Sequence, residues 1–161
     1  MSITYADIAK KYIELNMKWR ERNDFLQKCA CSLANEFNAS LELPDSSWVD
    51  ENGARHSYVQ LGVLNEKGCF EKKSVIAIKL DNDFTLTFTL SIMIDISQYG
   101  GMRPYLVTIS LKIIDGQLFV DIGKGRKQVI VSSPREEGAY VEACEAIKEL
   151  IIDGLTEPRL D

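Results

Sequence analysis

Residues 84–96 read FTLTFTLSIMIDI, and apolar side chains occupy every second position of this stretch. Seven apolar residues fall on one face, and a mostly hydroxyl-bearing set falls on the other. This two-residue period is typical of a strand with one buried face. Thirteen residues at about 3.3 Å each would span roughly 43 Å, which is longer than most strands. We therefore expect this strand to lie at the centre of an antiparallel sheet.

Shorter strands separated by turn signals surround this stretch, within residues 43–131. The Asn-Gly pair at 52–53 and the Asp-Gly pair at 115–116 mark tight turns. Alternating or apolar runs predict further strands at 56–64, 74–80, 105–114, 117–122 and 128–131. Because each connection is short, neighbouring strands should pair antiparallel in a meander of six or seven strands.

A helical segment is predicted before the sheet, within residues 1–40. Thr4 and Asp7 fit a capping box. Apolar residues then follow at helical spacing: Tyr5, Ile8, Tyr12, Leu15, Trp19, Leu26, Cys29 and Leu33. One continuous helix to about residue 38 would be about 52 Å long, and it would span the whole domain or project beyond it. The alternative is two helices that meet at residues 23–24, with Asp24 capping the second.

The apolar stripe of this helical segment is consistent with two arrangements. It can pack on the sheet, as most amphipathic helices do. Its heptad-like spacing also fits a coiled coil, which would make the chain a homodimer through its N-terminal helix. Aromatic residues at three of the repeating positions (Tyr5, Tyr12 and Trp19) favour packing on a sheet over a tight two-stranded seam.

A second helix is predicted over residues 133–154. Ser133 and Pro134 are typical of a helix start, and Gly154 is typical of a helix end. The tail, residues 155–161, is expected to be loose. The sequence thus predicts a single α+β domain, a two-layer sandwich with both helices on one face of an antiparallel sheet. It does not decide which sheet face meets solvent.

Composition and charge exclude several classes of function. The chain has 161 residues and a net charge of −5, and residues 133–161 carry eight acidic side chains against three basic ones. Such a balance argues against a nucleic-acid-binding protein, which usually needs a basic surface. No apolar run is long enough to span a membrane, and the first residues lack a basic segment followed by an apolar stretch, so we expect no membrane span and no signal peptide. A cytoplasmic protein with no membrane contact is the simplest prediction.

Residues that could carry chemistry are sparse. His56 is the single histidine, and it lies on a predicted strand with no nucleophile suitably placed beside it. The four cysteines form no Cys-x-x-Cys pair, so a structural zinc site is not expected. Asp81 and Asp83 flank Asn82 in a sequence that a hairpin turn prefers over a calcium loop. We predict no catalytic residue, no metal and no cofactor, and hence no enzyme.

The leading hypothesis is a non-enzymatic protein-binding module, such as a small acidic adaptor, chaperone, immunity protein or inhibitor. It would bind another protein through a sheet face or a helix surface. The first set of candidate contacts is the polar sheet face: Thr85, Thr87, Thr89, Thr108 and Lys112. The second set is the acidic face of the last helix: Glu142, Glu145 and Glu149. A solvated sheet back, with no partner, is the alternative for the first set.

Two other hypotheses remain open at this point. A small-ligand-binding or cryptic enzymatic domain would need a cavity between helix and sheet, with Tyr99, Arg103 and His56 at its mouth. Nucleic-acid contact would use the basic hairpin at 123–127, which carries Lys124, Arg126 and Lys127. This cluster leads into a strand and lacks the spacing of a phosphate-binding loop. No motif in the sequence points to a protein family.

Overall fold

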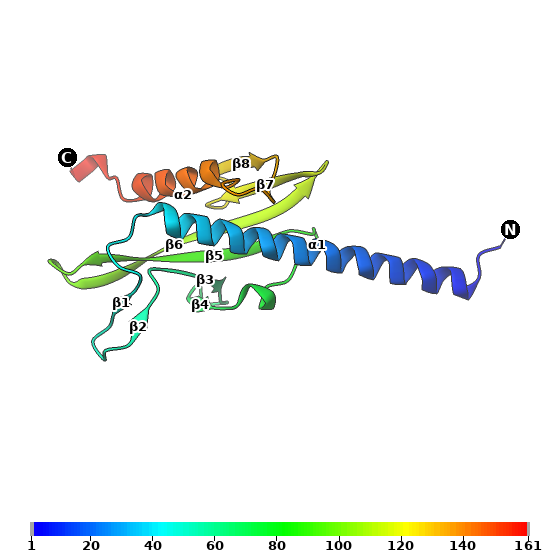
Figure 1. Cartoon of the computed structure of the whole chain (residues 1–161), viewed down its shortest axis with the longest axis horizontal. Coiled ribbons are helices and arrows are strands. Elements are labelled where there is room, and N and C mark those ends of the chain that lie inside the picture. The colour runs from blue at the N-terminus through cyan, green and yellow to red at the C-terminus, as the bar shows by residue number, and fades with distance from the viewer. Residues whose placement is uncertain (1, 161) are drawn as a thin grey trace.

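The computed structural model describes residues 2–160 and confirms the predicted α+β fold (Figure 1). Met1 and Asp161, which belong to the predicted segments 1–40 and 155–161, lie outside the described residues. The helices are α1 (Tyr5–Ser40) and α2 (Val141–Gly154), with single 3-10 turns η1 (Val75–Ala77) and η2 (Pro158–Leu160). The strands are β1 (Trp48–Val49), β2 (Arg55–His56), β3 (Val59–Leu64), β4 (Phe70–Lys72), β5 (Leu86–Ile96), β6 (Gly101–Ile114), β7 (Gln117–Ile122) and β8 (Lys127–Val131).

Six strands form one antiparallel sheet in the order β4-β3-β5-β6-β7-β8, and β1 and β2 form a separate two-stranded ribbon. The predicted central strand is confirmed, because β5 lies inside the sheet between β3 and β6. β5 and β6 pair along their whole common length, from Leu86 opposite Leu111 to Ile96 opposite Gly101. The two strands form a long hairpin that reaches one end of the molecule (Figure 1).

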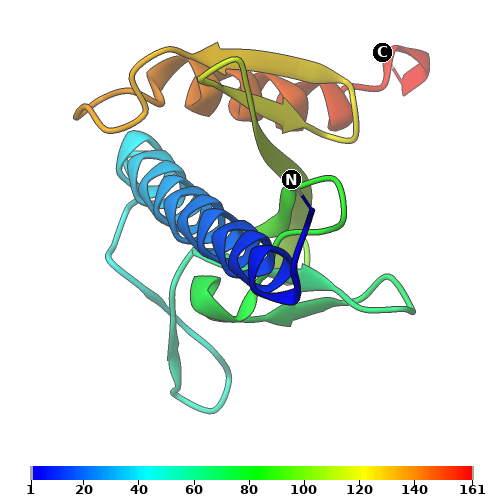
Figure 2. The same cartoon turned by 90° about the vertical axis from the view of Figure 1, so that its right-hand side faces the viewer.

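Both helices cover the same face of the sheet, as predicted. α1 packs on β3, β5 and β6, and α2 packs on β6, β7 and β8. The sheet curves around α1, with β3 and β4 on one side of the helix and β7 and β8 on the other (Figure 2). The centre of the core is formed by fully buried side chains of the helices and strands: Leu26, Leu33, Phe37, Leu86, Phe88, Leu90, Ile109, Leu111, Leu118, Ile122 and Ile147.

α1 is one continuous helix, so the alternative of two helices meeting at residues 23–24 is wrong. Thr4 and Asp7 make the predicted capping box at its start. Asn23 is buried, and its Oδ1 atom accepts a hydrogen bond from the backbone N–H of Leu80 at 3.2 Å. Gln27 Nε2 donates to the carbonyl oxygen of Ile78 at 2.8 Å. Polar residues in the middle of α1 thus attach a loop to the helix and do not interrupt it.

The predicted strand at 74–80 is wrong: this segment contains the turn η1 and no strand. Side chains of α1 bind this segment instead of a neighbouring strand. Asn23 accepts from the N–H of Leu80 and Gln27 donates to the carbonyl oxygen of Ile78, so neither backbone group is available for a sheet. The predicted strand at 56–64 is also divided between β2 and β3. The central strand begins at Leu86 rather than residue 84, because Phe84 has a φ of +57° and belongs to the preceding turn.

The last helix begins at Val141, so the predicted start at Ser133 is wrong. Residues 134–140 form turns in which Gly138 has a φ of +76°, and a right-handed helix cannot pass through that conformation. Tyr140 ends the turns with a buried side chain, whose hydroxyl donates to the carbonyl oxygen of Pro134 at 3.1 Å. The tail is not featureless, because it contains the turn η2.

Candidate functional site

The first half of α1 projects beyond the sheet (Figure 1). Buried residues on this helix begin at Asn23, and Trp19 is the residue closest to the N-terminus that packs against the core. Before Trp19, the large apolar side chains remain in solvent. Their exposed fractions run from 55% at Leu15 to 86% at Tyr5. This is an unusual amount of apolar surface for one short segment.

Four of these exposed residues continue the face that α1 buries elsewhere. A helix turns by about 100° per residue, so Ile8, Tyr12 and Leu15 lie above one another on the face that later carries Leu26 and Leu33. The sheet covers this face only after Trp19. We name the uncovered part, Tyr5, Ile8, Tyr12 and Leu15, the α1 stripe. It lies within residues 5–18, which span about 21 Å of helix.

An open groove of about 610 Å³ runs along the α1 stripe. Ile3, Ile8, Tyr12 and Leu15 form its apolar side. Its other side carries charges that alternate in sign along the helix: Asp7, Lys11, Glu14 and Lys18. Lys11 Nζ lies 3.8 Å from Glu14 Oε2, so neighbouring members of this charged row are already within ion-pair distance. An apolar floor with a charged border is the usual anatomy of a protein interface.

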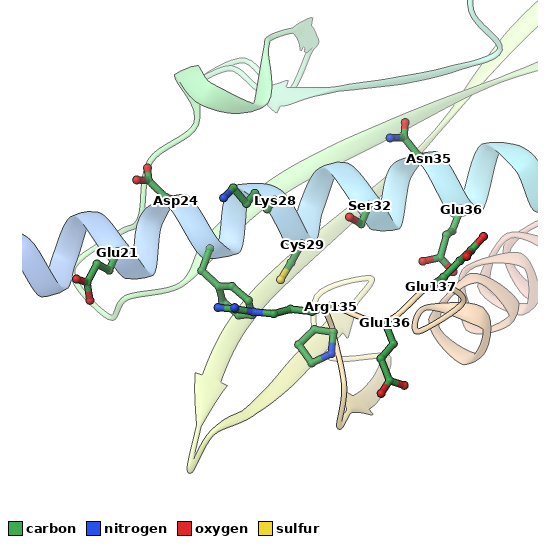
Figure 3. Close-up of a pocket in the computed structure, with 12 residues that line it drawn as sticks. Glu21, Asp24, Lys28, Cys29, Ser32, Asn35, Glu36, Arg135, Glu136 and Glu137 are labelled. Carbon is green, nitrogen blue, oxygen red and sulfur yellow. The ribbon is translucent and has the colours of Figure 1, made fainter.

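A second hollow, of about 860 Å³, lies between α1 and the turns at residues 134–137 (Figure 3). The Arg135 guanidinium stacks over the ring of Phe25, 4.9 Å from its centroid. Glu21, Asp24, Glu136 and Glu137 bring negative charge to the same hollow, and Lys28 brings positive charge. The side chains therefore form a mixed-charge cleft in which one cation–π contact bridges α1 and the turns.

The groups behind this cleft are structural. Burial raises the pKa of the Cys29 thiol, so the sulfur is held in its protonated, unreactive form. Tyr140 is fully buried, and desolvation raises the pKa of its hydroxyl well above its ordinary value. Its backbone N–H donates to Glu36 Oε1 at 3.3 Å. None of these groups is set up as a nucleophile or a general base.

Hydroxyl side chains of β5 and β6 pair with one another across the polar sheet face. Thr87 and Ser110 share a hydrogen bond of 3.0 Å between their hydroxyl oxygens, and Thr89 and Thr108 share one of 3.3 Å. Thr87 is exposed, but only 2% of Thr89 is accessible. The remaining candidates of this set, Thr85 and Lys112, are half-buried. The hydroxyls bond to one another, and this leaves fewer of them for a partner.

Two candidate surfaces that the sequence treated separately meet in the structure. Lys127 of the basic hairpin lies 3.0 Å from Glu149 of the acidic helix face. Glu145 is paired with Lys148 on the same helix, at 3.1 Å, and Glu142 is exposed. Lys124 and Arg126 remain exposed at the hairpin tip. This partial neutralisation weakens both the acidic face and the basic hairpin as binding surfaces.

Tyr99, Arg103 and His56 do not line a cavity between helix and sheet. Tyr99 and Arg103 lie near the tip of the β5–β6 hairpin, and Arg103 lines a hollow beside the β1–β2 ribbon. His56 belongs to that ribbon, where its Nε2 atom lies 2.7 Å from Asp50 Oδ2 and its ring lies 4.8 Å from that of Trp48. A hollow of about 340 Å³ does lie between α1 and β3, but other residues line it.

Within residues 2–160, no group of three or more His, Cys, Asp or Glu side chains is placed to hold a metal ion. No helix in this part of the chain combines the length and the apolar character needed to cross a membrane. No family model, curated protein or solved structure matches the chain. The geometry described above is therefore the basis for assigning a function.

The sequence places Tyr5, Ile8, Tyr12 and Leu15 on a predicted apolar helix stripe, but neither set of candidate contacts includes them. The spacing of Tyr5, Ile8 and Tyr12 predicted a buried helix face, and both packing on the sheet and a coiled coil satisfied it. The predicted length of the helix is the signal that separates these two alternatives. A helix of about 52 Å is longer than one small sheet can cover, so part of its apolar face must lie outside the sheet.

Proposed function

We propose that this chain is a non-enzymatic protein-binding module and that the α1 stripe is its main binding element. Such a role fits an adaptor, a chaperone, or an immunity or inhibitor-type protein. The observation that carries the proposal is the continuity of one helix face, which the sheet covers after Trp19 and leaves in solvent before it.

Binding through this face is favourable for a simple reason. Removing a Leu or Ile side chain from water contributes about 1.5–3 kcal/mol, and Ile8 and Leu15 are more than half exposed. Two tyrosines on the same face add large, rigid contact areas of the kind enriched at protein interfaces. Association also costs translational and rotational freedom, so a partner must cover most of the stripe to bind stably.

A pull-down with the tagged full chain tests the proposal. The test variant is Tyr12→Glu combined with Leu15→Glu, which places two charges on the stripe. The matched control is Ile13→Glu, because Ile13 is as exposed as its neighbours but lies on another side of α1. We expect a stoichiometric partner, whether another protein or untagged chain, to be lost with the test variant and retained with the control. Equal recovery by both variants would exclude the stripe.

A second candidate function is small-ligand binding in the cleft between α1 and residues 134–137. The volume of about 860 Å³ lies within the range of ligand pockets and favours it. Its mixed charge would suit a zwitterionic or polar ligand. A thermal-shift screen tests this, because a ligand specific for the folded chain raises the melting temperature. The shift should disappear in Arg135→Ala if the ligand occupies this cleft.

A further inference from the structure

We propose that the partner of the α1 stripe is the α1 stripe of a second copy of this chain, with the two helices antiparallel and related by a two-fold axis near residues 12–13. This inference rests on the proposed function, because it names the partner of the same surface. Three properties of the groove support a second copy: its charged row, its apolar spacing and its position relative to the domain.

The charged row is complementary to itself when two copies run antiparallel. With a two-fold axis between residues 12 and 13, Asp7 lies level with Lys18 of the second copy, and Lys11 lies level with Glu14 of the second copy. Symmetry repeats both pairs, so four acid–base pairs form along the groove. A parallel arrangement would instead place the two charged rows on opposite sides of the interface, where none of these pairs can form. Opposite charges across an interface select orientation and register.

The apolar residues of the two stripes interdigitate in a register close to the one that pairs the charged rows. Shifting the two helices by two residues places Tyr12 level with Leu15 of the second copy, and Ile8 level with Trp19 of the second copy. Two residues correspond to about 3 Å along a helix, a distance that the long side chain of a lysine can span. The charged row and the apolar row can therefore be satisfied together.

The contact area is sufficient for a specific dimer. A large aromatic side chain buries roughly 150–250 Å², and the two copies together contribute four tyrosines from the stripe. Adding Ile8 and Leu15 of both copies brings the buried surface to on the order of 1,000 Å², which specific interfaces need. In the two registers given above, Ile3 lies level with residues 22–24 of the second copy, where α1 meets the sheet. Each helix tip thus reaches the other copy's domain.

Light scattering of the full chain over a concentration series is the first test. One chain has a mass of 18.2 kDa, so we expect a mass of about twice that value for the wild type at high concentration. Tyr12→Glu with Leu15→Glu should restore the single-chain mass, whereas Ile13→Glu should keep the dimer. Circular dichroism confirms that each variant retains its helices. A wild type that stays at 18.2 kDa up to about 100 µM would overturn the second copy as partner.

Charge exchange tests the antiparallel register. Lys11→Glu places two carboxylates level with each other at two symmetric positions, and we expect the dimer to weaken by about tenfold. Combining it with Glu14→Lys restores both pairs and should restore the dissociation constant. Arg20→Glu is the control, because Arg20 is exposed and is not three or four residues from any member of the charged row. Failure of the exchange to restore binding would overturn the register.

These outcomes separate the inference from the proposed function. A monomeric wild type whose stripe still captures a different protein in the pull-down would disprove the dimer and keep the protein-binding role. A monomer that captures nothing through the stripe would disprove both.

Discussion

The Oδ1 atom of Asn23 accepts a hydrogen bond from the backbone N–H of Leu80 at 3.2 Å, and both residues are buried. This contact lies close to where α1 leaves the sheet, and it holds the loop between η1 and β5 against the helix. Asn23 lies at the position where the sequence allowed a break between two helices. In the structure it accepts a hydrogen bond from the backbone of Leu80, which belongs to no strand.

Asn23→Ala should therefore destabilise the domain. The substitution leaves the buried N–H of Leu80 without an acceptor, and we expect a loss of about 1–3 kcal/mol in the free energy of unfolding. Urea denaturation measures it. Asn16→Ala is the matched control, because Asn16 lies two turns earlier on the same side of α1 but is exposed. Similar losses from both variants would contradict this role for Asn23.

Gly154→Ala should destabilise the end of α2, although alanine normally favours a helix over glycine. A Cβ atom at residue 154 would overlap the hydroxyl oxygen of Tyr105. Because Gly154 is exposed and the end of the Tyr105 side chain can shift, we expect a small loss of about 0.5–1 kcal/mol, below that of an overpacked core site. Adding Tyr105→Phe removes the clashing oxygen and should recover part of the loss. Additive effects of the two substitutions in a thermal denaturation cycle would show that the contact is not made.

The β1–β2 ribbon should open in acid. The hydrogen bond from His56, followed by one from the backbone N–H of Ala54, holds the pKa of Asp50 below its usual range. A lowered pKa in the folded state means that the carboxylate stabilises the ribbon above the ordinary pKa of Asp. That stabilisation is lost as the pH falls through the folded value.

Trp48 reports this opening, because its ring lies 4.8 Å from that of His56. In a Trp19→Phe background, the fluorescence of Trp48 should change with a midpoint below the ordinary pKa of Asp. Asp50→Asn should remove the transition, whereas Asp45→Asn, at an exposed position on the preceding loop, should leave it in place. A transition that survives Asp50→Asn would assign the opening to another group.

Two of the four thiols should react with Ellman's reagent in the native protein. Cys31 and Cys69 are exposed, whereas Cys29 and Cys144 are buried. Burial raises the pKa of both buried thiols, that of Cys144 to about 11, so little reactive thiolate is present at neutral pH. Unfolding in denaturant should release the other two. Cys31→Ser with Cys69→Ser should show no rapid reaction, and rapid labelling of that variant would contradict the buried placement.

The sequence was sufficient for the elements whose side chains repeat with a clear period. The alternation over residues 84–96 predicted β5 and its place inside the sheet, and the helical spacing from Tyr5 predicted α1. It was insufficient where distant residues decide local structure. Residues 74–80 form a short apolar run like that of a strand, but Asn23 and Gln27, about fifty residues earlier, bond their backbone. In the same way, spacing alone could not show where the sheet stops covering α1.

The continuity of α1 also determines how its projecting half becomes helical. A free peptide of about fourteen residues is at best marginally helical in water, because the first turn is costly to nucleate. Here Leu26, Leu33 and Phe37 fix the second half of α1 in the core, and the helix can extend from that half toward Thr4 without a new nucleus. The projecting segment is therefore helical because the core of the domain holds the rest of α1 in place. Any loss of core stability should fray the tip, even when every residue of the stripe is intact.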